Sequence, residues 1–298
     1  MIVRTVGIVG AGTMGQGIAI TCAAAGLDVL LCEASADRAR EATTEIAASL
    51  DRDIAKWRRT EADKRAILAR LRSVPAVADL AAAELVIESV PEDLALKARI
   101  FQELDRACPP EDILATNTST LSVTEIAERT KRPDRVIGLH FLQPVPQVPL
   151  VEVVRGLKTS DTTFAEALEF ARVLGKTGVE VYEYPGYVTT RVILPFLNEA
   201  MHVVMEGVAT PTAVDTSMKL GYGLPVGPLA LADRMGLDEV WRWMTYLFEE
   251  LGDLKYRPCP LLRKMIRAGH LGVKTGRGFF EYDNAGNPRT APPPGAKR

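Results

Sequence analysis

The stretch that most constrains the fold is TVGIVGAGTMGQGIAITCAAAGLDVLLCE, residues 5–33. The apolar run Val6–Val9 predicts a short buried strand of a parallel sheet. A glycine turn follows, and the periodicity then predicts a helix over Met14–Ala25 that ends at Gly26. The run Leu27–Cys32 predicts a second strand. A strand, a tight turn, a helix and a parallel strand form one unit of an α/β sheet.

The glycine turn has the spacing of a dinucleotide-binding motif. Gly10, Gly12 and Gly15 form G-A-G-T-M-G, in which Thr13 and Met14 open the helix. The first glycine permits the turn, the second lets backbone approach a pyrophosphate, and the third allows close helix–strand packing. The helix N-terminus supplies N–H groups for the phosphates. Glycine turns alone are common, but here the strand and the helix that the motif requires are both predicted.

An acid closes the second predicted strand. Glu33 lies about 20 residues after the glycines, where a carboxylate can accept hydrogen bonds from the ribose hydroxyls. A carboxylate repels the 2′-phosphate of NADP, so we expect NAD as the cofactor. Arg38 lies nearby and keeps NADP open. The alternative to a cofactor site is a tight turn followed by an exposed acid.

The rest of the chain divides into two kinds of pattern. Further strands are predicted at ELVIESV, DILATN, RVIGLHF, LVEVV and GVEVYEY, with helical patterns between them. After YEYPGY the chain indicates successive helices from Thr189 to about Ala268. The fold class is therefore α/β, a Rossmann-type doubly wound, mostly parallel sheet followed by an all-helical C-terminal domain. We expect an NAD-binding domain at residues 1–184, a helical dimerisation and substrate domain at 185–284, and a mobile tail at 285–298.

Composition excludes several classes of function. Lys plus Arg is 36 and Asp plus Glu is 38, so the net charge of −2 gives no support to nucleic-acid binding. No apolar run is long enough to cross a membrane, and the N-terminus does not resemble a signal peptide. The cysteines are far apart in sequence and form no C-x-x-C pair, so we expect neither disulfides nor a metal site. A cytoplasmic location fits this cysteine usage.

GLHFLQPVPQVPLVEVV, residues 138–154, places a base and an acid among apolar residues. Histidine suits the removal of an alcohol proton because its pKa lies near neutrality. A carboxylate on the other ring nitrogen fixes the tautomer of such a base. His140 ends a predicted strand, and Glu152 lies beyond a loop with three prolines that can return the chain. Spacing alone fits equally well a capped strand-end histidine and a separate surface acid.

The segment TNTSTLS, residues 116–122, adds polar groups after another predicted strand. Ser119 is a candidate for a hydrogen bond to a substrate oxygen, and Asn117 is a candidate for the cofactor cleft. The alternative is a helix N-cap near Ser122, since clusters of Ser and Thr are more often caps than binding sites.

Together these motifs resemble the L-3-hydroxyacyl-CoA dehydrogenase family, and most closely its bacterial 3-hydroxybutyryl-CoA dehydrogenases. The likeness covers about residues 3–282 and is carried by GIVGAGTMGQGIA, IESVPEDLALK, NTSTLS, GLHFLQPVP, LVEVV, PGYVTTR, MKLGYGLPVGPLALAD, KYRPCPLLRKMIRAG and GVKTGRGFFEY. The resemblance implies a homodimer whose interface is the helical domain. It also implies reversible oxidation of a (3S)-hydroxyacyl thioester to the 3-oxo form with NAD.

The resemblance also implies roles for single residues. His140 matches the catalytic base, Glu152 its partner, and Ser119 a serine that contacts the substrate. Glu92 and Lys97 match residues on the nicotinamide side of NAD. The remaining matches are a cofactor-contacting lysine at Lys274 and a coenzyme A contact at the basic cluster that begins with Lys56.

Three positions depart from the family pattern. Thr190 stands where the family usually has an asparagine that helps hold the substrate. Gln143 stands where the family has asparagine next to the cofactor, which moves the amide by one methylene. Trp57 stands in the basic cluster where glycine is common.

Several functions remain open from the sequence. The first is a short-chain (3S)-hydroxyacyl-CoA dehydrogenase of fatty acid metabolism. The second is oxidation of a hydroxyacyl group, such as glyceryl, tethered to an acyl carrier protein in polyketide extender-unit biosynthesis. An acyl carrier protein is acidic, so a basic entrance to the active site would also suit this second function. A relative that acts on a free hydroxy acid and a nucleotide-binding protein without catalysis are further alternatives, and intact His140, Glu152 and Ser119 argue against the last.

Overall fold

The computed structural model describes residues 3–283 and 286–289. The chain forms two compact units, which separate between Tyr187 and Val188. Most of the expected tail, 285–298, lies outside the described residues. Each unit is considered by itself below.

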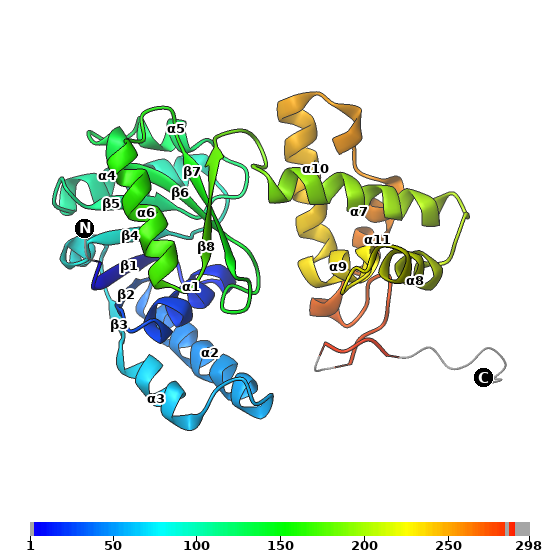
Figure 1. Cartoon of the computed structure of the whole chain (residues 1–298), viewed down its shortest axis with the longest axis horizontal. Coiled ribbons are helices and arrows are strands. Elements are labelled where there is room, and N and C mark those ends of the chain that lie inside the picture. Colours follow the sequence, from blue (N-terminus) through cyan, green and yellow to red (C-terminus); the bar gives the residue numbers. More distant parts are fainter. Residues whose placement is uncertain (1–2, 284–285, 290–298) are drawn as a thin grey trace. The chain divides into compact units, whose positions relative to one another are not determined.

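The first unit contains an eight-stranded sheet in the order β3-β2-β1-β4-β5-β6-β7-β8 (Figure 1). Neighbouring strands are parallel except for β6 and β7, which pair antiparallel. This arrangement confirms the expected Rossmann-type, mostly parallel sheet. The strands are β1 (Thr5–Val9), β2 (Asp28–Cys32), β3 (Leu71–Val74), β4 (Leu85–Glu88), β5 (Ile113–Thr116), β6 (Val136–Phe141), β7 (Leu150–Arg155) and β8 (Thr177–Tyr182).

Helices cover both faces of the sheet, which produces two hydrophobic cores. Side chains alternate along β1, so Ile8 belongs to one core and Val9 to the other. The first core is closed by α1 (Thr13–Ala24), α2 (Ala36–Ala55), α3 (Glu61–Ala69) and α6 (Asp161–Val173). The second is closed by α4 (Leu94–Ala107), α5 (Val123–Ala127) and the 3₁₀ turn η1 (Val77–Ala82).

The strand order places the expected cofactor motif at the point where the sheet changes direction. The chain builds β1, β2 and β3 outwards and then returns to β4 on the other side of β1. The loops after β1 and β4 are in contact, because a Cβ added at Gly10 would lie 2.8 Å from the carbonyl oxygen of Ser89. Ligands of open α/β sheets bind in the crevice at such a point.

One strand, β3, was not predicted from the sequence. β3 consists of LRSV, and its side chains are exposed or half-buried. Because it has no apolar run, it lacks the pattern by which a buried strand is recognised. It pairs with β2 at the edge of the sheet.

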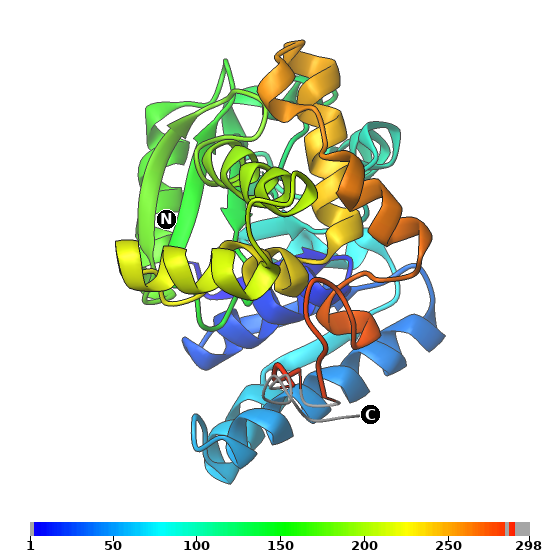
Figure 2. The ribbon, with the colours of Figure 1, turned by 90° about the vertical axis from the view of Figure 1, so that its right-hand side faces the viewer.

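The second unit is a bundle of helices, coloured from yellow-green to orange in Figure 2. It comprises α7 (Thr189–Met205), α8 (Pro211–Tyr222), α9 (Pro228–Met235), α10 (Leu237–Leu251) and α11 (Pro260–Arg267). Leu194, Leu229 and Met244 lie in its apolar core. None of the helices described in residues 3–283 and 286–289 is long and apolar enough to cross a membrane.

A buried carboxylate ties the end of the helical unit to α9. Asp233 is 1% exposed and accepts hydrogen bonds from the backbone N–H groups of Phe279 and Phe280, both at 3.0 Å, and from the Tyr282 hydroxyl at 2.9 Å. Burial raises the pKa of Asp233 to about 6, against the lowering effect of these three donors. A Cβ at Gly278 would lie 1.9 Å from Asp233 Oδ1, which explains the third glycine of GVKTGRGFFEY.

Candidate active site

The glycine loop has the conformation that the motif predicts. Gly10 has φ of 91°, in the left-handed region that favours glycine, and its N–H donates to the carbonyl of Cys32 at 2.9 Å. A Cβ at Gly15 would lie 1.9 Å from the carbonyl oxygen of Gly10, so helix and turn touch there. A Cβ at Gly12 would meet nothing within 4 Å. Gly12 is therefore the glycine whose missing side chain leaves open space.

The first turn of α1 is suited to an anion. Gly12 is the N-cap residue and provides no side-chain hydrogen bond, and the first turn contains no acid. The N–H groups of this turn thus lack a side-chain cap, and the turn itself contains no acid that would occupy the positive end of the helix dipole. Thr13 is exposed and Met14 is half-buried at this opening. These features fit the pyrophosphate of NAD.

Glu33 lies against the same loop. One carboxylate oxygen accepts a hydrogen bond from the N–H of Ala11 and the other from the N–H of Ala34, at 3.0 Å. Arg38 Nε lies 3.9 Å from this second oxygen. The carboxylate therefore stands beside the glycine turn, as a ribose-binding acid at the end of β2 requires.

The base and the acid meet across two antiparallel strands. His140 and Glu152 are directly opposite each other in the pairing of β6 with β7. Their side chains thus lie next to each other on one face of the sheet. His140 Nδ1 is 2.6 Å from Glu152 Oε2, and the two residues are only 4% and 1% exposed. The structure therefore brings the pair together as a histidine and its hydrogen-bonded carboxylate.

The ring of Tyr187 packs against the imidazole. The two ring centroids are 5.5 Å apart with planes tilted by 58°. The Tyr187 hydroxyl donates to the carbonyl of Leu121 at 3.2 Å, and the residue has φ of 48°. Since Nδ1 faces Glu152, Nε2 is the ring nitrogen left to act on a substrate. Sequence analysis missed Tyr187, although the motif PGYVTTR contains it.

Glu92 organises the segment that carries Ser119. Its Oε1 accepts hydrogen bonds from the Ser119 N–H at 3.0 Å, from the Thr120 N–H at 3.2 Å, and from the hydroxyls of Thr118 and Thr120. Its Oε2 lies 3.3 Å from Lys97 Nζ. Burial alone would raise the pKa of Glu92, but Lys97 and these donors outweigh burial and lower it. Glu92 is thus ionised at neutral pH and fixes the backbone of Ser119.

Lys97 is fully buried between two carboxylates. Its Nζ lies 2.7 Å from Glu88 Oε1, in addition to its contact with Glu92. The other oxygen of Glu88 accepts a hydrogen bond from the Thr116 hydroxyl at 2.7 Å. Glu88 was not singled out from the sequence, where it ends an apolar strand. The ion pair explains how an acid and a lysine are both tolerated in the core at the ends of β4 and β5.

Asn117 joins three strand ends. Its Oδ1 accepts a hydrogen bond from the N–H of Phe141 at 3.0 Å, and its Nδ2 donates to the Ser89 hydroxyl at 3.4 Å. Phe141 follows His140 in β6, so the amide helps to fix the strand that holds the base. The expected contact of Asn117 with a cofactor stays a prediction.

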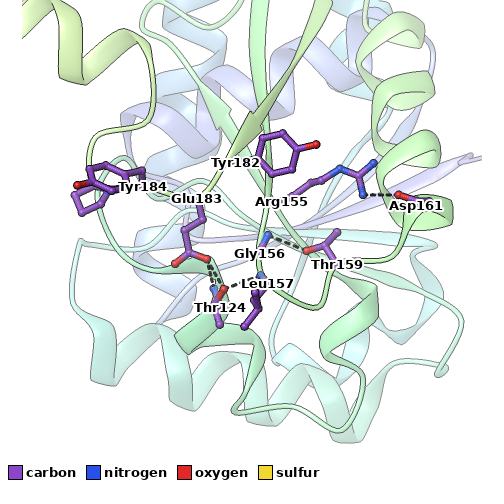
Figure 3. A pocket seen from close by; sticks show the side chains of 10 residues that line it. Thr124, Arg155, Gly156, Leu157, Thr159, Asp161, Tyr182, Glu183 and Tyr184 are labelled. Atoms are coloured by element: carbon purple, nitrogen blue, oxygen red, sulfur yellow. Dashed lines mark hydrogen bonds and ion pairs between the residues drawn. The ribbon is translucent and has the colours of Figure 1, made fainter.

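A surface hollow of about 690 Å³ lies elsewhere on the first unit (Figure 3). Its charged groups face protein partners: Arg155 forms an ion pair with Asp161 at 2.9 Å, and Glu183 accepts a hydrogen bond from the N–H of Thr124 at 2.9 Å. None of the expected catalytic or cofactor residues lines it. The hollow is therefore separate from the candidate active site.

Comparison with protein families identifies both parts of the chain. Residues 5–184 match the NAD-binding domain of 3-hydroxyacyl-CoA dehydrogenase, and residues 186–282 match the C-terminal domain of the same enzyme. The chain belongs to the 3-hydroxyacyl-CoA dehydrogenase family. Its N-terminal domain is the NAD-binding domain of this family, as the glycine motif predicted.

Individual relatives agree with this membership. The chain is 48% identical over 283 residues to a probable 3-hydroxybutyryl-CoA dehydrogenase of Bacillus subtilis, covering 95% of this chain and 99% of the relative. It is 37% identical over 291 residues to the mitochondrial hydroxyacyl-coenzyme A dehydrogenase of Rattus norvegicus, covering 95% and 92%. The crystal structure of (S)-3-hydroxybutyryl-CoA dehydrogenase from Ralstonia eutropha superposes with a TM-score of 0.87 at 47% identity, covering 95% of this chain and all of that one.

The basic cluster contains one departure from the family pattern. Trp57 has φ of 55°, and its side chain is 96% exposed at the end of α2. A position in the left-handed region favours glycine, the residue that the resemblance implies there, and this chain instead has tryptophan. Lys56 is exposed beside it, whereas Arg58 and Arg59 lie 3.6 and 3.7 Å from the carboxylate of Asp53.

The remaining expected residues lie in different parts of the molecule. Gln143 is exposed in the loop after β6. Thr190 is buried in the first turn of α7, and Lys274 Nζ lies 2.6 Å from Asp238 Oδ2, both in the helical unit. Their roles in binding cofactor and substrate stay predictions.

Proposed function

We propose that this protein interconverts a short-chain (3S)-hydroxyacyl-CoA, such as 3-hydroxybutyryl-CoA, and its 3-oxo form with NAD. The observation that carries the proposal is the buried contact between His140 and Glu152. It lies near the carboxyl ends of the parallel strands, the end of the sheet that also carries the glycine loop. Family membership and the names of the similar proteins support the substrate class.

The pair acts as a base held in one tautomer. The N–H of His140 Nδ1 donates a hydrogen bond to Glu152 and keeps its proton, so Nε2 carries a lone pair and accepts the proton of the substrate 3-hydroxyl. Glu152 then stabilises the imidazolium that forms. NAD, when bound, supplies the hydride acceptor. Ser119, whose backbone Glu92 fixes, is proposed to donate a hydrogen bond to the substrate oxygen.

The test is NADH consumption with acetoacetyl-CoA as the oxo substrate. His140→Gln should lower kcat by about 10²- to 10⁴-fold, the usual contribution of a general base, while NADH still binds. His202→Gln is the matched control, because His202 belongs to α7 in the helical unit, outside the proposed catalytic pair. Unchanged turnover in His140→Gln would remove this histidine from the mechanism.

The same assay addresses the carrier of the acyl group. The comparisons give no support to a substrate tethered to an acyl carrier protein. If the wild-type protein bound NADH but did not reduce acetoacetyl-CoA, the acyl group or its carrier would have to differ from the one proposed here. Thr190 would then be the first residue to test.

We further propose a cytoplasmic homodimer that associates through the helical unit. Free, buried cysteines at positions 22, 32, 108 and 259 fit a reducing compartment. Strongly exposed apolar side chains are characteristic of association surfaces. In the helical unit they include Val192, Val208, Leu220, Tyr222 and Leu254. Light scattering coupled to size exclusion should give twice the 32.4 kDa mass of the chain, and a monomer would contradict the proposal.

A further inference from the structure

The loop that joins the two members of the catalytic pair docks on the cofactor-binding helix. Residues 142–149 connect β6 to β7 and contain three prolines, which have no N–H to donate. Val145, in the middle of the loop, is buried at 2% exposure. A Cβ at Gly17 of α1 would lie 2.9 Å from Val145 Cβ, so loop and helix are in direct contact. The loop thus connects the strand of the base to the strand of its partner and packs against helix α1 of the glycine motif.

A single lysine holds this loop from the other side. Lys176, which precedes β8, is 8% exposed. Its Nζ donates to the carbonyl oxygens of Val145 and Val148, both at 2.6 Å. Among the described residues it forms no ion pair, and burial lowers its pKa. The N–H of the next residue, Thr177, donates to the carbonyl of Pro149 at 2.8 Å.

Burying an ammonium group that has carbonyl acceptors but no carboxylate is unfavourable, and an apolar side chain of similar size would avoid that penalty. What the ammonium adds is two directed, charge-assisted hydrogen bonds to a loop whose prolines leave it few donors of its own. Both acceptors lie in the eight residues that separate the strand of His140 from the strand of Glu152.

We infer that Lys176 is a positioning residue, which fixes the 142–149 loop on α1 and thereby holds His140 and Glu152 in the geometry that proton transfer requires. Its ammonium group donates to the loop carbonyls of Val145 and Val148 and not to the imidazole. Small displacements of a catalytic group can lower turnover by orders of magnitude. A residue that does not itself contact substrate or cofactor can therefore control kcat. The inference rests on the proposed dehydrogenase function.

The experiment compares Lys176→Met with Lys158→Met in the full-length protein. Methionine keeps a long apolar stem but has no donor. The control lysine is exposed and pairs with Glu128 on the surface, at 2.8 Å. Lys176→Met should lower kcat for acetoacetyl-CoA reduction by about 10- to 100-fold, with little change in the thermal midpoint, whereas Lys158→Met should match the wild type.

Hydrogen exchange gives a second readout that does not need activity. The N–H groups of Gln147 and Val148 both donate to the carbonyl of Pro144, at 3.0 and 3.1 Å, and report on the loop. In Lys176→Met these amides should exchange at least about tenfold faster, while those of β1 keep their wild-type rates.

Two results would overturn the inference. One is wild-type kcat or unchanged loop exchange in Lys176→Met. The other is a loss of activity matched by faster exchange throughout the first unit, which would make Lys176 a residue of general stability. Failure of the proposed function looks different: the wild-type protein would not reduce acetoacetyl-CoA, yet the exchange comparison would still show whether Lys176 holds the loop.

Discussion

The two glycines Gly12 and Gly15 should respond in opposite ways to the same added methyl group. Gly12 has φ of −68° and ψ of −172°, which alanine adopts without strain, and a Cβ there meets nothing within 4 Å. Gly12→Ala should therefore change the free energy of unfolding by less than about 0.5 kcal/mol. The methyl group would occupy the space through which backbone approaches the pyrophosphate. The Kd of NADH should rise at least tenfold, or about 1.4 kcal/mol.

Gly15→Ala should instead act on stability. Its Cβ would lie 1.9 Å from the carbonyl oxygen of Gly10, which is backbone and cannot rotate away. Helix α1 would have to move from the turn, at a cost of about 1–3 kcal/mol, the range for overpacking. Urea unfolding and NADH fluorescence titration measure the two effects on each variant. An unchanged Kd in Gly12→Ala, or unchanged stability in Gly15→Ala, would refute the assignment of these roles.

Three further predictions concern ionisable groups. Glu152→Gln should lower kcat by about 10²- to 10⁴-fold, because an amide neither selects the tautomer of His140 nor stabilises the imidazolium; steady-state turnover that stays within threefold of wild type would contradict this. The wild-type protein should have at least about tenfold lower kcat/KM with NADPH than with NADH, and Glu33→Ala should narrow that gap; equal use of both cofactors by the wild type would exclude selection by Glu33. Asp233 has a pKa raised from 3.8 to about 6, so the folded state binds its proton more tightly and this group adds stability as the pH falls from 7 towards 4. By linkage its contribution at pH 5 is on the order of 1 kcal/mol. Urea unfolding at pH 7 and pH 5 should show this part of the difference missing in Asp233→Asn, and an identical difference in both proteins would refute it.

The fold class and the cofactor motif could be predicted from the sequence because both depend on local patterns. Apolar runs and the spacing of Gly10, Gly12 and Gly15 are visible in a short window, and they predicted the Rossmann-type sheet that the structure shows. The exposed strand LRSV of β3 has no such pattern and was missed. Strand direction could not be predicted either, because nothing local indicates that β7 runs antiparallel to β6 and parallel to β8.

The site was only partly predictable because its contacts join distant segments. Spacing made the meeting of His140 and Glu152 possible, but the register of two strands decides it. Glu88 and Lys97 look like a strand-end acid and an ordinary helix lysine until folding buries them against each other. Tyr187 lies 47 positions after the histidine that it packs against.

The pairing of β6 with β7 also limits how this enzyme can change over evolutionary time. Successive side chains in a strand point to opposite faces, so a slip of one residue would send Glu152 to the far side of the sheet from His140. A one-residue insertion or deletion within 142–149 is tolerable only if the loop absorbs it without shifting the strands. Val145 and Val148, which are held by Lys176, leave little slack for that. For the proposed mechanism, the length of this connection therefore matters as much as the identity of the two residues that it joins.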